Sequence, residues 1–522
     1  MNMSTITVPG YSVSDRIPRV AFALLLGQGS RTPAQSPLDI LLVGPRSYDE
    51  ATGLTPLGVA DDNEPQRIYS VDDAIDYWGQ KSPIVRMAAR VLSSYPGATL
   101  WGCSCTKGAG TRGSVTMTVA GTATAAGSVI LGVGDKSFEI PVASGASAAT
   151  VGAAIEAALD ADDALPCYPD YAIGVLTLLN PWYGPEQGYE LAVLQNVAGI
   201  TLGSPTPAAG TVACLWDAAF TAAFGGVPSI DYVVPATDVV ATLTSGATCL
   251  KAQIASALAP TTGLLCAAVV GNTDDTAAGA ATMTAAWDDG GTDYSETGYW
   301  SQVVWARNYG AEPWCVAAAV AGLRVQAEES SPQLNWIGLQ GGPIVPSMVA
   351  PWSASDAVLS DSVLNAALLA GVTPIKYEWD VEKSHVVLSI TAKHQIGSVA
   401  NATMLENTNV PAVCRAVSYG IRTSLALAFS GFAIVSDVDG EAPDDLPSRT
   451  TSPQLVKEFL VATMKTDYEA RAWVKKVEAH RDVTGVEQDS DNPSRLLYEL
   501  PMDVPRWVTQ IVGVHRALGG TG

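Results

Sequence analysis

The sequence predicts a mixed α/β protein of several domains, and three observations support this fold class. The chain has 522 residues, enough for about three or four domains of ordinary size. Short apolar runs bounded by Pro or Gly alternate with segments of helical period, as buried strands and helices do. The 48 Gly and 32 Pro residues indicate many turns and a substantial β content. With 48% hydrophobic and 16% charged residues, the composition is that of a folded chain.

The first part of an α/β core is predicted at residues 25–108. PLDILLVGP, bounded by Pro37 and Gly44, is typical of a buried strand. Ser70 can cap a helix that continues to Tyr77, and Pro83 can begin a second helix. ATLWGC is the next predicted strand. The apolar face of the second helix comprises Ile84, Met87, Ala88 and Val91.

Residues 109–211 are predicted to form a β-rich insertion domain. Here β-branched residues alternate with Gly and Ser, and SVILGV and SFEIPV flank a turn at Asp135, as in a hairpin. SAATVGAAIEAALDADDA is a short predicted helix. IGVLTLLNP and GYELAVLQ are predicted strands.

The second part of the core is predicted at residues 212–372. TDVVATLTSGATCLKAQIASAL is expected to form one helix, GLLCAAVVG a buried strand, and EPWCVAAAVAGLRVQAEES a helix that begins at Pro313. A further helix is expected in SASDAVLSDSVLNAALLAGVT, capped by Ser355 and ended by Gly371. Its apolar face comprises Val358, Leu359, Leu364 and Leu368.

A C-terminal α+β domain is predicted at residues 373–504. IKYEWD and HVVLSIT are expected strands joined by a turn at VEKS. The segment 452–482 then predicts one helix from Pro453 to about His480, roughly 40 Å long. One stripe of this helix is apolar and is expected to face the core. It comprises Leu455, Val456, Phe459, Leu460, Trp473, Val474 and Val477.

Basic residues gather on the same segment, although the whole chain has a net charge of -23. On a helix, Lys457, Arg471 and Lys475 share one edge of the apolar stripe. Lys465 and Lys476 lie further round, close to Glu458 and Glu469. Two interpretations remain open: a solvated face with ordinary i,i+4 ion pairs, or a contact surface for an acidic partner.

Both ends of the chain are predicted to be extended arms, at residues 1–24 and 505–522. Prolines separate each arm from the nearest compact unit, and the C-terminal arm alternates in the manner of a strand. Each arm either folds back onto its own sheet or adds a strand to a neighbouring subunit. The candidate contact residues are Ile17, Val20, Phe22, Trp507, Val508, Ile511 and Val512.

Several classes of protein are disfavoured. A pI near 4.4 argues against nucleic-acid binding. No secretory signal and no apolar run of about 18 residues is present. The eight cysteines are expected to be small buried residues. No catalytic motif, cofactor loop or metal-ligand spacing occurs, and acidic pairs such as Asp274 and Asp275 are interpreted as helix caps, with a small residual chance of a divalent cation.

The order of these segments resembles that of contractile tail sheath proteins of Mu-like bacteriophages. SDRIPRVAFALLLGQG is similar to the family's opening, an IP…RV arm that leads into a strand ending in Gly-Gln. The next helical segment is similar to one with an aromatic-Gly-x-x-Ser motif, here Trp78, Gly79 and Ser82. Residues 109–211, EPWCVAAAVAG…SPQLNWIGLQG and LNAALLAGVTPIKYEWDVEKSHVVLSIT resemble its insertion and later core. Leu388 stands where the family often has a basic residue, which puts any ion pair made there in doubt.

The resemblance implies a structural protein rather than an enzyme. Such subunits form six-fold rings stacked as a helical sheath around a tail tube, and contraction drives the tube through the host envelope. It implies the tube protein, baseplate and tail terminator as partners, neither nucleic acid nor membrane insertion, assembly in the host cytoplasm and a place in the virion tail. It also implies that Lys457, Lys465, Arg471 and Lys475 face the tube. The alternatives are the sheath of a bacterial contractile injection system, another tail component, or an α/β hydrolase or nucleotide-binding enzyme.

Overall fold

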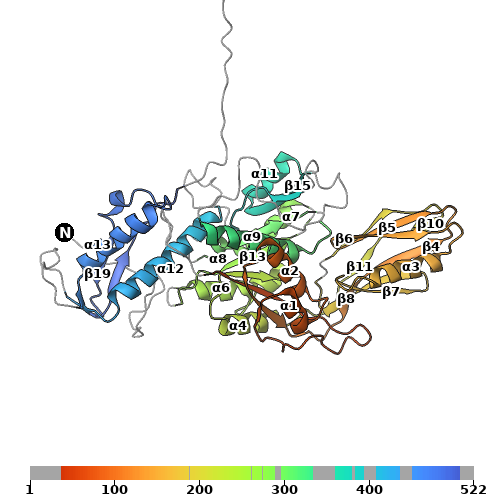
Figure 1. Ribbon diagram of the computed structural model, residues 1–522, viewed down its shortest axis with the longest axis horizontal. Coiled ribbons are helices and arrows are strands. Elements are labelled where there is room, and N and C mark those ends of the chain that lie inside the picture. Colours follow the sequence, from red (N-terminus) through yellow and green to blue (C-terminus); the bar gives the residue numbers. More distant parts are fainter. Residues whose placement is uncertain are drawn as a thin grey trace, which may run out of the picture.

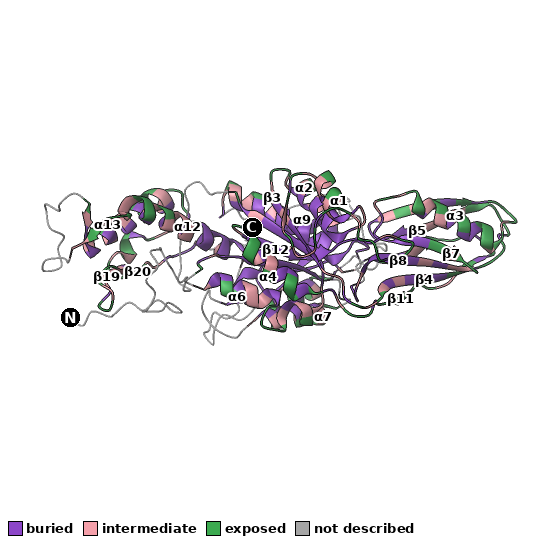
Figure 2. Ribbon diagram, turned by 90° about the horizontal axis from the view of Figure 1, so that it is seen from below, coloured by how far each residue is buried: buried purple, intermediate pink, exposed green. Residues whose placement is uncertain are grey.

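The protein is a mixed α/β molecule, as the sequence predicts. The computed structural model describes residues 37–186, 189–259, 262–272, 274, 276–288, 296–307, 309–332, 359–378, 383–392, 407–435 and 449–505. Within them, a central sheet with helices on both faces lies between two smaller regions (Figure 1). A β-rich region projects from one side, and the C-terminal region lies on the other, so the described molecule is elongated (Figure 2).

The central sheet has the strand order β16-β15-β14-β13-β12-β1-β3-β2. Its inner strands are parallel, and the edge strands β2 and β16 are antiparallel to their neighbours. Helices cover both faces, which explains why the strands are almost continuously apolar. The strands are β1 (Asp39–Pro45), β2 (Gln66–Ile68), β3 (Thr99–Cys105), β12 (Tyr232–Pro235), β13 (Ala267–Asn272), β14 (Ser301–Trp305), β15 (Val372–Glu378) and β16 (Lys383–Val386).

The helices of the central region begin largely where the sequence predicts. Ser70 caps α1 in a capping box with Asp73, and Pro83 and Pro313 begin α2 and α9. The predicted apolar face of α2 is buried. These helices are α1 (Val71–Trp78), α2 (Pro83–Ser94), α4 (Trp216–Gly226), α5 (Val240–Thr244), α6 (Leu250–Leu258), α7 (Ala277–Trp287), α8 (Thr297–Trp300), α9 (Pro313–Ser330) and α11 (Asp361–Leu369).

The aromatic-Gly-x-x-Ser segment forms the corner between α1 and α2. Trp78 is buried against Gly102 of β3, where an added Cβ would lie 2.4 Å from the indole ring. Gly79 ends α1 with a φ of 83°, a conformation that strains other residues. Ser82 caps α2 and donates a hydrogen bond to the carbonyl of Pro45 at 2.9 Å. The motif thus fixes the two helices to the end of β1.

Residues 112–208 form a β-rich region with its own hydrophobic core, here called the distal unit. A sheet of order β10-β4-β8-β7, with β11 also paired to β4, faces the sheet β6-β5-β9. The predicted hairpin around Asp135 is confirmed, because Val133 pairs with Lys136. The elements are β4 (Arg112–Gly121), β5 (Gly127–Val133), β6 (Lys136–Val142), α3 (Ala148–Asp160), β7 (Tyr168–Ala172), β8 (Val175–Tyr183), β9 (Leu191–Gln195), β10 (Ile200–Leu202) and β11 (Thr206–Ala208).

The C-terminal region, residues 449–505, connects to the central region through the long helix α12 (Figures 1 and 2). The first half of α12 is buried, and its second half is largely accessible. Before this region come α12 (Asn409–Phe429) and β17 (Ala433–Ile434). The region itself contains β18 (Thr450–Thr451), α13 (Pro453–Thr463), a π-helical turn (Met464–Glu469), a 3₁₀ turn (Glu478–His480), β19 (Gly485–Gln488) and β20 (Leu496–Glu499).

Two helix predictions need correction. The segment 237–258 forms two helices, α5 and α6, because the chain turns at Gly246 with a φ of 113°. The helix predicted in SASDAVLSDSVLNAALLAGVT is α11, which begins at Asp361 and is capped by Ser360. The expected cap, Ser355, lies outside the described residues. Gly371, with a φ of 78°, ends this helix as predicted.

The central sheet extends beyond residue 372, where the sequence analysis ends the core. β15 begins there and pairs with β14, and β16 continues the sheet. β16 stops at Val386, so Leu388 follows the strand rather than lying in it. The arm residues Ile17, Val20, Phe22, Trp507, Val508, Ile511 and Val512 lie outside the described residues.

Two further expectations concern the whole chain. All eight cysteines are buried with free thiols, as predicted. Among the residues that the structure describes, no helix has the length and apolar character needed to cross a membrane.

Candidate contact surface of the C-terminal region

The prediction of one helix from Pro453 to His480 is wrong beyond Glu469. α13 begins as expected, with the Ser452 hydroxyl accepting a hydrogen bond from the Leu455 N–H at 3.3 Å. After the π-helical turn the chain bends. The N–H groups of Trp473 and Val474 both donate to the carbonyl of Tyr468, at 3.2 and 3.3 Å.

Two residues in the bend have left-handed backbone conformations that a continuing helix excludes. Ala472 has a φ of 50° and Lys476 a φ of 61°. The bend buries Trp473, Val474 and Val477, and the two valines belong to the same core as Val456 and Leu460. The predicted apolar stripe is therefore mostly buried, but on a bent chain. Leu455, at 39% exposed, departs from it.

Because the helix is broken, the basic residues do not share one edge. Lys475 instead pairs with Asp503, its Nζ lying 3.2 Å from Oδ1. The N–H of Lys475 also donates to the Asp503 carbonyl at 3.4 Å. Lys476 Nζ lies 3.6 Å from the other carboxylate oxygen. The Asp503 side chain is buried, so this pair ties the end of the described chain to the bend.

Lys465 belongs to a second, exposed network. Its Nζ lies 3.1 Å from Glu478, which also pairs with Arg481, and Arg481 pairs in turn with Glu458 of α13. Hydrogen bonds from Arg481 and Lys465 lower the pKa of Glu478. Exposed pairs of this kind contribute little to stability, because water competes for both charges.

The remaining candidates differ from each other. Lys457 is half-buried, and none of the ion pairs between described residues includes it. Arg471 is exposed. Burial and the charge of Asp467 raise the pKa of Tyr468, and the charge of Arg471 lowers it. The Arg471 guanidinium therefore lies near the Tyr468 phenol. The segment 452–482 holds six basic and five acidic residues, so it is nearly neutral rather than strongly positive.

A two-stranded antiparallel sheet lies beside these residues. β19 and β20 pair in continuous register from Gly485 with Glu499 to Gln488 with Leu496. Val486, Leu496 and Tyr498 pack against the core that α13 also contacts. Among the described strands, neither β19 nor β20 has a second partner. The sequence analysis did not single out this open sheet, although SRLLYEL, with its alternating β-formers, marks one of its strands.

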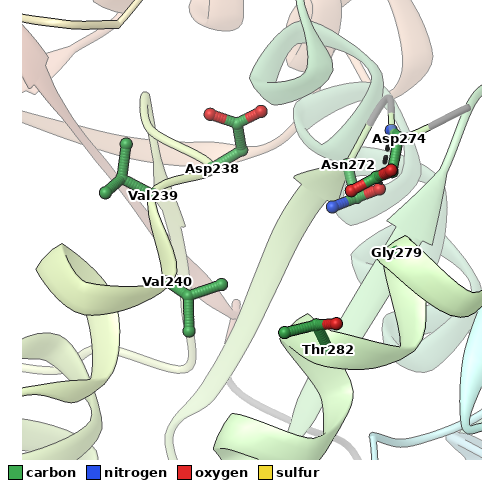
Figure 3. A pocket seen from close by; sticks show the side chains of 7 residues that line it. All are labelled: Asp238, Val239, Val240, Asn272, Asp274, Gly279 and Thr282. Carbon is green, nitrogen blue, oxygen red and sulfur yellow. Dashed lines mark hydrogen bonds between the residues drawn. The ribbon is translucent and has the colours of Figure 1, made fainter.

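A cavity of about 470 Å³, where an enzyme would place its catalytic groups, lies near the carboxyl ends of β12 and β13 (Figure 3). Asp238, Asn272, Asp274 and Thr282 supply its polar groups, and the Asp274 N–H donates to the Asn272 side chain at 2.9 Å. Burial raises the pKa of Asp238. Among the described residues that line the cavity, none carries a basic, thiol or imidazole group. Within the described ranges, no cluster of three or more His, Cys, Asp or Glu residues is suited to hold a metal.

Comparisons with known proteins give a distant likeness among solved structures. No protein-family model matches the chain, and no curated protein matches its sequence. Among solved structures, the chain is similar to a crystal structure of a sheath tail protein from Listeria innocua, with 11% identity, a TM-score of 0.38 and 88% of each chain covered. A TM-score this low does not establish a shared family.

Proposed function

We propose that this chain is a structural subunit of a contractile phage tail sheath, one that polymerises around the tail tube and contracts to drive it through the host envelope. The observation that carries the proposal is the β19–β20 sheet, which has no further partner among the described strands. It occurs in a chain whose two ends are predicted from the sequence to be strand-like arms. The sequence resemblance to sheath proteins of Mu-like phages supports it independently. The protein would be located in the virion tail, after assembly in the host cytoplasm.

The β19–β20 sheet suits strand addition. A two-stranded ribbon is marginal alone, whereas three or more strands over an apolar face are stable. The edge strand of a small sheet can offer N–H and C=O groups to an incoming strand. An added strand gains roughly 0.5–1.5 kcal/mol net for each hydrogen bond. Two edges and two arms allow one subunit to accept a strand from each of two neighbours, through Ile17, Val20 and Phe22 or through Trp507, Val508, Ile511 and Val512.

The charges of the arms and of the sheet are complementary. Residues 1–24 contain Arg16 and Arg19 against a single acid, Asp15, and residues 505–522 contain two arginines and no acid. The sheet carries one acidic residue on each strand, Glu487 and Glu499. Opposite charges steer encounter and favour one register over others. Basic arms are unusual in a chain of net charge -23, and a self-assembly contact explains them.

Arm exchange of this kind joins different surfaces on the two partners. Such a heterologous contact generates rings if it closes and helical filaments if it does not. Six-fold rings stacked as a helix, as the resemblance implies, use both. The baseplate and the tail terminator would then contact the two ends of the stack.

The tube contact is a second part of the proposal. Lys457, Lys465, Arg471 and Lys475 remain its candidates. Lys465 and Lys475 would have to exchange an acid of their own chain for one of the tube, since they already pair with Glu478 and Asp503. Weak exposed contacts repeated on every subunit suit a grip that must release during contraction.

Truncation of the arms tests the proposal. Chains lacking residues 1–20 or 506–522 are expected to remain folded, with the thermal unfolding of the full chain, and to form no long tubes in electron micrographs. Because the truncations leave every described element in place, a loss of tubes with unchanged unfolding isolates the arms. Ordered tubes from both truncated chains would contradict the proposal.

A further inference from the structure

The helix α12 controls where the C-terminal region sits. It enters the central region with a buried first half that includes Val413 and Val417, and leaves it with an accessible second half, where Leu427 is 83% exposed. In both views α12 is the described element that runs from the central region to α13 and β19 (Figures 1 and 2). A rotation of α12 about its axis would therefore swing the whole C-terminal region.

One charged residue anchors the buried half of α12. Arg415 is fully buried, and its Nη1 lies 3.4 Å from Oε1 of Glu328 on α9. Its guanidinium carbon lies 4.5 Å from the ring centre of Tyr232 on β12 and 5.6 Å from that of Trp300 on α8. The Tyr232 hydroxyl donates to the same Glu328 carboxylate. Arg415 thus contacts three separate elements of the central region.

A second polar anchor lies one turn further along the same face. The Tyr419 hydroxyl accepts a hydrogen bond from the Leu265 N–H at 3.0 Å, next to the start of β13. Residues four apart share a face of a helix, so Arg415 and Tyr419 together fix the rotation of α12. Apolar contacts are non-directional and tolerate small rotations, whereas these two contacts have defined partners.

Glu329, the residue of α9 that follows Glu328, binds the segment that leads into β1. Glu329, next to Glu328, accepts a hydrogen bond from the Leu38 N–H at 2.7 Å and another from the Tyr95 hydroxyl. Leu38 directly precedes β1, where the N-terminal segment joins the sheet. In the last turn of α9, Glu328 therefore binds α12, and Glu329 binds the residue that directly precedes β1.

Stability alone does not account for the buried arginine. Within the described residues, none of the Arg415 guanidinium nitrogens makes a hydrogen bond of good geometry. A buried ion pair with unsatisfied donors is a poor source of stability, and an apolar pair of similar volume often does as well or better. What such a pair can supply is a unique geometry.

We propose that Arg415 is a positioning residue: with Glu328 it fixes the orientation of α12, and so of residues 449–505, relative to the central sheet and to the base of the N-terminal segment. The inference stands independently of the proposed sheath function, since it concerns a single chain.

Distance measurements between two spin labels on the full chain test this. Val59→Cys and Val483→Cys provide exposed attachment points in the central and C-terminal regions, and the eight native thiols are buried. The parent should give one narrow distance distribution. Arg415→Met with Glu328→Gln removes both charges and keeps an acceptor for the Tyr232 hydroxyl. This pair of changes should broaden and shift the distribution while thermal unfolding stays cooperative.

The control removes an ion pair elsewhere. Lys136→Met with Asp162→Asn eliminates a pair of 2.6 Å in the distal unit and should leave the distribution narrow. An unchanged distribution in the Arg415→Met, Glu328→Gln chain would overturn the proposal. If that chain fails to fold, the same distance measurement is made on Arg415→Lys, which keeps the charge but loses the flat group that stacks on Tyr232. A broader distribution then supports the proposal, and an unchanged one contradicts it.

Discussion

The distal unit and the C-terminal region both expose the edges of small sheets, and they treat those edges in opposite ways. In the distal unit, Pro169 interrupts β7, Pro141 interrupts β6 and Pro207 lies in β11. β9 has an extra residue, Leu194, opposite β5, where the register shifts. In the C-terminal region, β19 and β20 contain neither a proline nor a register shift.

This difference supports the proposal that the β19–β20 sheet, and not the distal unit, receives another strand. Proline has no N–H to donate, and a bulge twists an edge out of line, so both devices prevent further pairing. The distal unit therefore disfavours further pairing at β6, β7, β9 and β11. The β19–β20 sheet lacks these devices, although the same chain uses them elsewhere.

The two regions also differ in how they join the central sheet. The Arg86 guanidinium on α2 donates to the carbonyl of Ala164 at 2.7 Å, and its Nη2 lies 3.5 Å from Oδ1 of Asp135 in the distal unit. The hydroxyls of Tyr168 and Tyr183 donate to loop carbonyls of the central region, both at 2.8 Å. Side chains from several segments hold the distal unit, whereas α12 and its buried arginine hold the C-terminal region.

The largest expected effect comes from truncating the two cores. Leu460→Ala in α13 and Leu178→Ala in the distal unit each remove a fully buried side chain, and each should cost about 2–5 kcal/mol of unfolding free energy. Only Leu460→Ala should abolish tube formation at a temperature where both chains are folded. Calorimetry measures the unfolding free energy, and electron microscopy shows whether tubes form. Equal loss of tubes in both variants would show that the two regions do not differ in their role in assembly.

A pH-dependent effect is expected where the distal unit joins α4. Glu186 is buried, and burial raises its pKa to about 7, although Trp216 donates a hydrogen bond to it at 3.0 Å. The folded state therefore holds a proton that the unfolded state releases at lower pH. Stability should fall by about 1–3 kcal/mol as pH rises from 4.5 to 7 and then level off.

Glu186→Gln keeps the acceptor for Trp216 and removes the titration, so it should flatten this part of the profile. Denaturant unfolding of both chains between pH 4 and 8 provides the measurement. A variant profile as steep as that of the parent would exclude Glu186 as the source.

A smaller gain of stability is expected at the bend in the C-terminal region. Ala472 holds a left-handed conformation that costs a non-glycine residue about 1–2 kcal/mol. Ala472→Gly should relieve this cost, with a net gain below about 1 kcal/mol, because glycine also loses more entropy on folding. Ala470→Gly, at a residue with helical φ, is the control and should destabilise. Destabilisation by both changes would show that the bend does not depend on this residue.

The smallest effects concern the candidate tube contacts. Lys465→Ala should change the stability of the isolated chain by about 0–1 kcal/mol, since its pair with Glu478 is exposed. Lys475→Ala should lower the unfolding free energy by more, because the buried Asp503 carboxylate then keeps fewer positive charges beside it.

Lys457→Glu is expected to leave sheath formation without the tube unchanged and to weaken attachment to the tube at low salt. Attachment at parental strength would remove Lys457 from the contact.

Local signals in the sequence were sufficient for much of the fold. Ser70, Pro83 and Gly371 mark helix ends through short-range geometry, and the Asp135 turn sets a hairpin by itself. α12 was missed, although Val413, Val417, Ile421 and Leu425 repeat every four residues and are all buried. That stripe was a usable signal.

The candidate site was harder to predict, because its shape depends on distant contacts. The bend after Glu469 follows from two N–H groups that share the Tyr468 carbonyl, and helical period cannot reveal this. Asp503 lies 28 residues from Lys475 in the chain, so their pair has no signature in the local sequence. The Glu328–Arg415 pair spans an even longer separation.

The central claim is that an arm of one subunit adds a strand to the β19–β20 sheet of another, and intermolecular cross-linking tests it most directly. Chains carrying Leu497→Cys in β20 would be mixed with chains carrying Val512→Cys in the C-terminal arm, then oxidised under assembly conditions. The account predicts a disulfide-linked dimer that forms only in the mixture, and none when Leu194→Cys in β9 replaces Leu497→Cys. No dimer in the mixture, together with an internal disulfide in single chains carrying both cysteines, would show that the arm folds back onto its own sheet and would contradict the account.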